Sequence, residues 1–294
     1  MGRFSLPASA DTVAAYIGAT FLRGTVKPSI LQSYLSPINT RQAVDGLARP
    51  ALGPFLASVR AGYHRRWYEA VGALPPERAK FPAAAARQIA LAAARSTCPH
   101  ARSRLTTITT SFLFFRRTAE LLRLTLGDVR VLPDGGVAFQ VTRYKNAERR
   151  PGARRLSYVV PPDSDGAELP VAIVRDRVAW LAASGAAPLQ PLFSPLGVLT
   201  PPSGDAMGRW LTAACAELGI TAPAGAFFAP YSTRGGAATA AYAVGVPEDR
   251  IVAFFGHNRR DTVTAHTHYI DAFADPCPAA CLFFDRFLPR KRPR

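Results

Sequence analysis

This sequence of 294 residues has few acidic residues, few cysteines and no long apolar run, and each shortage narrows what the protein can be. The four cysteines form no paired CxxC motif, and no histidine is placed to complete a zinc site, so we expect reduced thiols and no metal. No signal-peptide pattern opens the sequence and no stretch is long and apolar enough for a membrane span. We therefore expect an intracellular protein without a membrane partner, nuclear in a eukaryote and cytoplasmic otherwise.

The scarcity of acidic residues leaves a strong positive charge. Lysine and arginine number 36 against 20 aspartates and glutamates, which gives a formal charge of +16 and a pI near 10.5. Such a field attracts polyanions, and nucleic acid is the first candidate because its phosphates recur along the whole contact. A basic structural or RNA-binding protein is the alternative from another class. A hydrophobic content of 48% argues against a disordered basic protein.

Lysine is rare, because arginine supplies nearly all of the positive charge. Lysine can give up its proton and arginine cannot, so each retained lysine is of interest as a proton donor. The lysines are Lys27, Lys80, Lys145 and Lys291.

The length is sufficient for two domains. Residues 1–82 have helical patterns, and we expect helices at 11–21, capped by Asp11, at 28–38 and at 52–63. The stretch 64–68 then mixes cations with aromatics and includes Arg65 and Arg66. It is either a surface that contacts a nucleic-acid backbone or a solvated basic face over buried aromatics. A proline-rich strip, 74–82, is the predicted linker.

Residues 83–294 are predicted to form the second domain, with two helices first, at 83–95 and 99–114. Three strands follow, at 129–132, 136–143 and 156–160, with a hairpin turn at 133–136. Further helices are expected at 171–185 and 207–218. The predicted fold class is mainly α with a small antiparallel β-sheet, that is, α+β.

Polar residues that suit a phosphodiester gather between Pro230 and Ile270. Tyr231 and Arg234 stand at the head of a helical run, and a Gly-Val-Pro break follows at 245–247. A short apolar helix, 251–255, then leads to His257, and the stretch ends with His266, His268 and Tyr269. Arginine offers a forked donor, histidine a further hydrogen bond, and tyrosine a hydroxyl that can attack phosphorus.

A second motif lies upstream, in the stretch from Arg117 to Val129. Arg117 and Glu120 are three residues apart, so on a helix they share a face and the carboxylate can orient the guanidinium. An ordinary surface ion pair, which contributes little, is the alternative. Lys145 lies in a turn between two predicted strands, where a lysine is usually only solvated.

These motifs resemble those of the tyrosine recombinases, or phage-type integrases. That family has R-x-(S/T)-E-L-x-x-L-x-x-x-D-(I/V), then H-x-x-R-(H/G)-x-x-A-T, a G-(H/W) pair and a nucleophilic tyrosine. The first pattern is matched from Arg117 to Val129, with Ala119 in the hydroxyl position, and the others from Tyr231 to Tyr269. Residues 1–82 are similar, more weakly, to the family's helical core-binding (SAM-like) domain. The resemblance implies a DNA-clamping domain at 1–82 and a catalytic domain at 83–294 with a basic C-terminal tail.

The resemblance also implies roles for individual residues. Two arginines neutralise the phosphate, a lysine protonates the leaving oxygen, and a tyrosine forms a 3′-phosphotyrosine, without metal or cofactor. The implied catalytic residues are Arg117, Lys145, Tyr231, Arg234, His257 and Tyr269, with Glu120 in support and Arg65, Arg66 and Arg143 on the DNA. The implied partners are double-stranded DNA and further copies of the chain, which would form a tetramer on two duplexes. The implied origin is a mobile element, and a eukaryotic host is one alternative.

Two departures from the family pattern leave alternatives open. Tyr231 stands where the family usually has histidine. Its hydroxyl can still donate a hydrogen bond to a phosphate oxygen, but tyrosine is a poor base near neutral pH because its pKa is about 10. An ungapped alignment from His257 places the nucleophile column on His266, with Tyr269 about one helical turn later. The protein is therefore either a recombinase that uses Tyr269 or a catalytically inactive DNA-binding descendant. Type IB topoisomerases and telomere resolvases use similar chemistry, but this chain is short for either.

Overall fold

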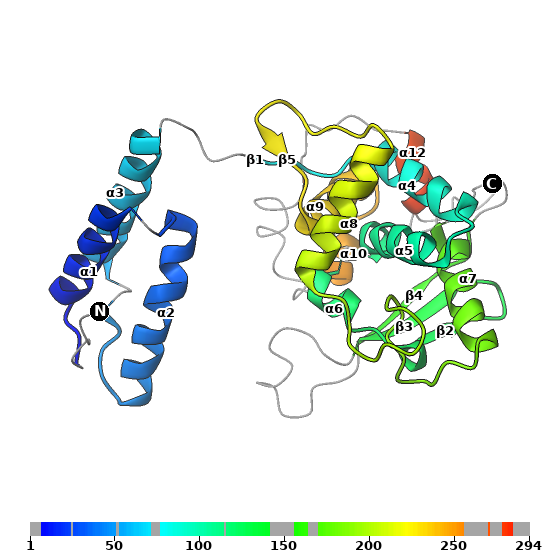
Figure 1. Cartoon of the computed structure of the whole chain (residues 1–294), viewed down its shortest axis with the longest axis horizontal. Helices are drawn as coiled ribbons and strands as arrows, with labels where there is room; N and C mark the ends of the chain where they lie inside the picture. Colours follow the sequence, from blue (N-terminus) through cyan, green and yellow to red (C-terminus); the bar gives the residue numbers. More distant parts are fainter. Residues whose placement is uncertain are drawn as a thin grey trace. The chain divides into compact units, whose positions relative to one another are not determined.

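The computed structural model describes residues 7–24, 26–50, 53–71, 77–114, 116–141, 156–163, 170–255, 270 and 278–284. They belong to two compact units, Met1–Pro76 and Glu77–Arg294 (Figure 1). Each unit has its own apolar core. Most elements are helices, and the larger of two small sheets is antiparallel. The predicted fold class is confirmed.

The first unit contains three helices, α1 (Ala10–Arg23), α2 (Pro28–Val44) and α3 (Pro54–Val71). The predicted cap of α1 was wrong, because Ser9 accepts the N–H of Thr12 at 3.1 Å, while Asp11 lies in the first turn and favours the helix dipole. The helix α2 is longer than predicted. Its last turns bury the polar Gln42, which donates to the carbonyl of Ala8 at 3.3 Å, so apolar periodicity did not reveal them.

The two units divide between Pro76 and Glu77, six residues before the predicted boundary at 82. Strand β1 (Glu77–Arg78) pairs in parallel with β5 (Ala226–Phe227) of the second unit. Phe81 is fully buried in the core of that unit, and its N–H donates to the carbonyl of Ser232 at 3.0 Å. The end of the proline-rich strip therefore belongs to the second unit, since backbone pairing and a buried aromatic ring hold it there.

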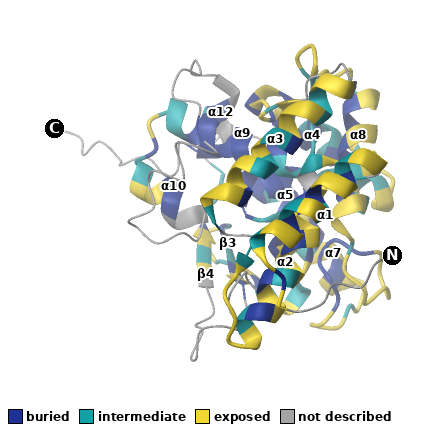
Figure 2. Ribbon diagram, turned by 90° about the vertical axis from the view of Figure 1, so that its left-hand side faces the viewer, coloured by how far each residue is buried: buried dark blue, intermediate teal, exposed yellow. Residues whose placement is uncertain are grey.

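Helix α5 (Pro99–Phe114) forms the centre of the second unit, and α4 (Ala83–Arg95), α7 (Pro170–Ala183), α8 (Gly204–Glu217) and α9 (Pro230–Ala243) pack against it (Figure 1). The bounds of α4 and α5 agree with the prediction. Figure 2 shows α5 and α9 in the buried colour, which agrees with continuous buried runs at 106–114 and 232–241.

The buried part of α5 contains threonines that would be costly in a core if their hydroxyls had no partner. Each threonine hydroxyl donates to the carbonyl four residues earlier, at 2.6–3.0 Å. This bonding within the helix satisfies the polar atoms and leaves the methyl groups for packing. The threonines are Thr106, Thr107, Thr109 and Thr110.

The three-stranded sheet has the order β2–β3–β4, with β2 (Val129–Val131), β3 (Val137–Val141) and β4 (Leu156–Val160) all antiparallel to their neighbours. The predicted hairpin turn joins β2 to β3. Gly135 has φ 84°, and the N–H of Gly136 donates to Oδ1 of Asp134 at 2.9 Å.

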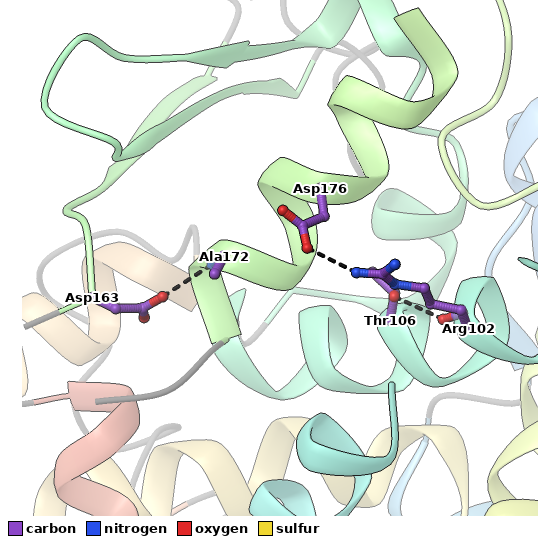
Figure 3. A network of polar contacts seen from close by, with 5 residues as sticks. All are labelled: Arg102, Thr106, Asp163, Ala172 and Asp176. Carbon is purple, nitrogen blue, oxygen red and sulfur yellow. Dashed lines mark hydrogen bonds and ion pairs between the residues drawn. The ribbon is translucent and has the colours of Figure 1, made fainter. Parts of the chain in front are cut away.

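Helix α7 is fastened at its start and on one side (Figure 3). Asp163, just after β4, accepts the N–H groups of Val171 and Ala172 at 2.9–3.3 Å, so a carboxylate caps the helix from outside it. Asp176 pairs with Arg102 of α5 at 2.7 Å.

The remaining elements are α6 (Thr118–Leu122), the 3₁₀ turn η2 (Leu126–Asp128), α10 (Glu248–Phe255) and α12 (Pro278–Phe284). Of the helices in the described parts of the chain, none combines the length and apolar character that a membrane crossing needs. The same residues include no group of three or more His, Cys, Asp or Glu that could hold a metal ion.

Candidate active site

Helix α9 places Tyr231 in its first turn and Arg234 at the start of its second. Pro230 occupies the first helical position, which suits its fixed φ, and Ser232 accepts the N–H of Ala229 at 3.0 Å. The helix is built largely of glycine and alanine, which let it lie deep in the core. At Gly236 an added Cβ would lie 1.9 Å from the carbonyl oxygen of Phe81, so only glycine fits under this backbone crossing.

Arg234 is 1% exposed, and the central carbon of its guanidinium lies 5.9 Å from the ring centroid of Tyr231. A second cation, Arg78 of β1, lies 5.6 Å from the same centroid. The tyrosine ring therefore lies near two guanidiniums, one buried and one exposed. The electron-rich face of an aromatic ring attracts a cation. Sequence reasoning missed Arg78, because only the short β1–β5 pairing brings it near residue 231.

Arg117 forms the predicted ion pair with Glu120, Nη1 to Oε1 at 2.9 Å. The prediction that both lie on a helix was partly wrong, since Arg117 is the N-cap of α6 with extended backbone and only Glu120 is inside. The N-cap position leaves the side chain of Arg117 28% exposed while Glu120 is 5% exposed. A cation that reaches solvent is thus held by a buried carboxylate, unlike a pair that is exposed on both sides.

A further arginine joins this pair. Arg116 contacts the other oxygen of Glu120, Nη2 to Oε2 at 2.9 Å, and is 4% exposed. Its Nη1 also donates to the hydroxyl of Tyr158 on β4 at 2.7 Å. The sequence contained a signal for this contact, because Arg116 lies four residues before Glu120. We did not single it out, because its neighbour Arg117 is the arginine that matches the family motif.

A buried hydrogen bond joins α5, the helix that precedes Arg116 and Arg117, to α9, the helix that contains Arg234. The hydroxyls of Ser111 and Thr233 lie 2.7 Å apart, between α5 and α9. Thr233 directly precedes Arg234, and Ser111 is six residues before Arg117. The packing of α5 on α9 and of α6 on α5 thus brings the two motifs, more than a hundred residues apart in sequence, to one part of the unit.

The other predicted site residues are placed differently or lie outside the described residues. Arg65 and Arg66 are exposed on α3, whereas Tyr63 is buried and stacks on the half-buried Trp67 with ring centroids 6.1 Å apart. Both interpretations of this segment require exposed arginines, so both remain open. The residues that lie outside the described part of the chain are Arg143, Lys145, His257, His266 and Tyr269.

A cavity of about 380 Å³ lies near the first turns of α5 and is lined by residues that include His100, Arg104, Trp180 and Trp210. None of the predicted site residues lines it. The cavity is therefore separate from the arginine groups, which adjoin the other end of α5.

Solved structures with the same arrangement of elements are numerous, although the sequence itself is divergent. No protein-family profile matches the sequence, and no curated protein matches it significantly. A structure of the XerH site-specific recombinase bound to a palindromic difH substrate, a post-cleavage complex, is 11% identical, with a TM-score of 0.56 over 90% of this chain and 71% of that chain. The fold is that of a tyrosine recombinase.

Two further structures have the same fold. A lambda integrase tetramer bound to a Holliday junction is 14% identical and has a TM-score of 0.52, over 98% of this chain and 68% of that chain. The Tn1549 transposon integrase in complex with transposon right-end DNA is 13% identical and has a TM-score of 0.54, over 91% of this chain and 84% of that chain. At such low identities the likeness extends to the fold and leaves each residue's role to be argued from its own chemistry.

Proposed function

We propose that this chain is a site-specific DNA recombinase or integrase that cuts and rejoins strands through a 3′-phosphotyrosine. The observation that carries the proposal is the pair of guanidiniums, Arg117 held by Glu120 and Arg234 buried in α9, in a fold shared with recombinases. Attack on a phosphodiester builds negative charge on the nonbridging oxygens. Guanidiniums fixed in advance lower the energy of that charge without reorganising during the reaction.

In the proposed reaction the hydroxyl of Tyr269 loses its proton to solvent and its oxygen forms a bond to phosphorus, while the bond from phosphorus to the 5′-oxygen breaks. Lys145 gives its proton to the leaving oxygen, which becomes a 5′-hydroxyl, and His257 donates a hydrogen bond to the phosphate. The covalent ester retains the bond energy, so a 5′-hydroxyl from another strand can reverse the step without ATP. Tyr231 contributes a hydroxyl donor in place of the usual histidine.

The proposed partner is double-stranded DNA, gripped by both units. The charge of +16 and the exposed Arg65 and Arg66 of the first unit support a backbone-binding role for residues upstream of Glu77. Arg143 is proposed as a further DNA contact. A tetramer on two duplexes is the proposed working state, by analogy with the lambda integrase tetramer on a Holliday junction.

A catalytically inactive DNA-binding descendant is the second candidate. It is favoured by two features of the sequence, Tyr231 at the histidine position and His266 in the ungapped nucleophile column. Such a protein would keep the fold and the charge but would not form a covalent adduct.

The test is a nicked suicide substrate that carries the element's own end sequence, with a denaturing gel to detect the covalent protein–DNA adduct. Wild type, Tyr269→Phe and His266→Phe are compared, with Arg234→Lys as a variant that keeps the charge but loses the fork. An adduct that is lost only in Tyr269→Phe, and weakened by about a hundredfold in Arg234→Lys, supports the recombinase. Tight binding without an adduct from wild type would support the inactive descendant instead.

A further inference from the structure

Glu120 is shared by two arginines that are exposed to very different degrees. Its Oε1 accepts a hydrogen bond from Nη1 of Arg117 at 2.9 Å, and its Oε2 forms an ion pair with Nη2 of Arg116, also at 2.9 Å. The Arg117 side chain is 28% exposed and the Arg116 side chain 4%. Only Arg117 can therefore reach a phosphate outside the fold, while Arg116 faces other side chains.

Arg116 is held on its other side by β4. Its Nη1 donates to the hydroxyl of Tyr158 at 2.7 Å, and its central carbon lies 4.6 Å from the centroid of the tyrosine ring. Tyr158 stands opposite Phe139 of β3 in the sheet register. Phe139 in turn packs edge-on against Phe114, the last residue of α5, with ring centroids 4.0 Å apart. The guanidinium of Arg116 thus joins the Glu120 carboxylate on α6 to β4. The neighbouring strand, β3, is in turn packed on α5.

Stability alone does not explain a second buried arginine at this place. A buried ion pair usually contributes no more than well-packed apolar side chains of the same volume, because both ions lose their hydration. What the arrangement adds is geometry: a carboxylate bound on one oxygen could rotate, whereas one bound on both oxygens is fixed in its plane.

We propose that Arg116 is a positioning residue for strand cleavage, acting through Glu120 to fix the guanidinium of Arg117. The inference rests on the recombinase function proposed above. Arg116 itself does not touch DNA. Tyr158 takes part by holding Arg116 against β4, so the orientation of Arg117 depends on the sheet as well as on α6.

The experiment compares Tyr158→Phe and Arg116→Lys with wild type. Tyr158→Phe keeps the ring and removes only the hydroxyl, so it should fold even where a larger change would not. Arg102→Met, at the far end of α5, is the matched control, since its exposed ion pair with Asp176 has little effect on folding. The melting temperature and the DNA affinity of each variant are measured first, and only variants that equal wild type in both are compared further.

Two measurements then separate positioning from structural support. The first is the ¹⁵N signal of the Arg117 guanidinium in the free protein, assigned with Arg117→Lys. The second is the single-turnover rate of adduct formation on two suicide substrates, one with the natural 5′-oxygen at the scissile bond and one with sulfur there. A thiol leaves without a general acid, because its pKa is about 8.5, so the sulfur substrate bypasses the lysine.

The expected result is a shifted Arg117 signal in both variants and a cleavage rate about tenfold lower in Tyr158→Phe, equally on oxygen and sulfur substrates. Arg102→Met should behave as wild type. An unchanged Arg117 signal, or variant rates equal to the control while wild type forms adducts, would overturn the role of Arg116 alone. Full recovery on the sulfur substrate would also overturn it, since the defect would then lie in protonating the leaving group. Absence of an adduct from wild type would overturn the proposed function itself.

Discussion

The crossing of α9 by the backbone at Phe81 makes a sharp prediction for Gly236→Ala. A Cβ at this position would lie 1.9 Å from the carbonyl oxygen of Phe81 and 2.7 Å from its nitrogen and carbonyl carbon. The first contact must lengthen to about 3.4 Å, and the neighbour is backbone, so no side chain can turn away. Opening the gap also stretches the hydrogen bond from Phe81 N–H to Ser232, now 3.0 Å.

The size of the effect follows from opposing terms. Overpacking a core costs about 1–3 kcal/mol, with this backbone clash at the upper end, and the weakened hydrogen bond adds about 1 kcal/mol. Alanine gains about 1 kcal/mol over glycine inside a helix. We expect a net loss of about 3 kcal/mol in the free energy of unfolding, which lowers the melting temperature of a unit of this size by about 6–12 °C.

Gly208→Ala is the matched control, because Gly208 also lies inside a helix, α8, of the same unit. Its Cβ would meet Pro230 at 3.7 Å, an ordinary contact, so this change should stabilise by up to about 1 kcal/mol. The assay is urea unfolding of the full chain followed by tryptophan fluorescence. A Trp67→Phe background leaves Trp180 and Trp210, both in the second unit, as reporters. Equal midpoints for the two alanine variants would refute the argument.

Three further predictions test other parts of the second unit. Asp163→Ala should lower the free energy of unfolding by about 1–2 kcal/mol in the same urea assay, because α7 loses its carboxylate cap, and Asp163→Asn should lose less. The pKa of the exposed Cys98 thiol is lowered, mainly by a hydrogen bond from the backbone N–H of Ala101, while burial raises the pKa of the Cys215 thiol. At pH 7, maleimide should therefore label Cys98 long before Cys215, which peptide mass spectrometry would measure, and equal labelling rates would contradict this. Tyr231→Phe keeps the ring between its cations but removes the hydroxyl, so adduct formation should fall about tenfold and Tyr231→His should restore it; equal rates for all three would exclude a role for the hydroxyl.

The sequence predicted local structure well wherever a helix or strand followed its own periodicity. The bounds of α4 and α5 and the turn at 133–136 agreed, because alanine-rich and apolar repeats and an Asp-Gly-Gly turn are local signals. The failures came from contacts distant in sequence. The two units divide six residues before the predicted domain boundary, because β1 pairs with β5, about 150 residues later, and no local pattern records that pairing.

The same distinction applies to the candidate site. The ion pair of Arg117 with Glu120 could be predicted, since both are in one motif, and the structure contains it. The contact of Arg116 with Tyr158 and that of Arg78 with Tyr231 could not be predicted, because each joins two segments that meet only in the folded unit. The resemblance to a family supplied residues that touch the phosphate, while tertiary packing supplied those that orient them.

Buried arginine is the feature that connects the stability of this unit to its proposed chemistry. Arg234 and Arg116 are almost fully buried, and Arg177, which donates to the carbonyls of Leu192 and Ser194, is buried too, so that burial lowers its pKa to about 10. Arg177 joins a loop to α7 and needs no substrate, because carbonyls satisfy its guanidinium. Arg116 and Arg117 instead share one carboxylate just after α5, the helix that a buried hydrogen bond joins to α9. A basic protein that only coats nucleic acid gains nothing from burying charge, since exposed arginines bind phosphate as well. The proposed phosphoryl transfer gives Arg116 and Arg234 a further reason for burial, because it requires charges that are fixed before the anion arrives.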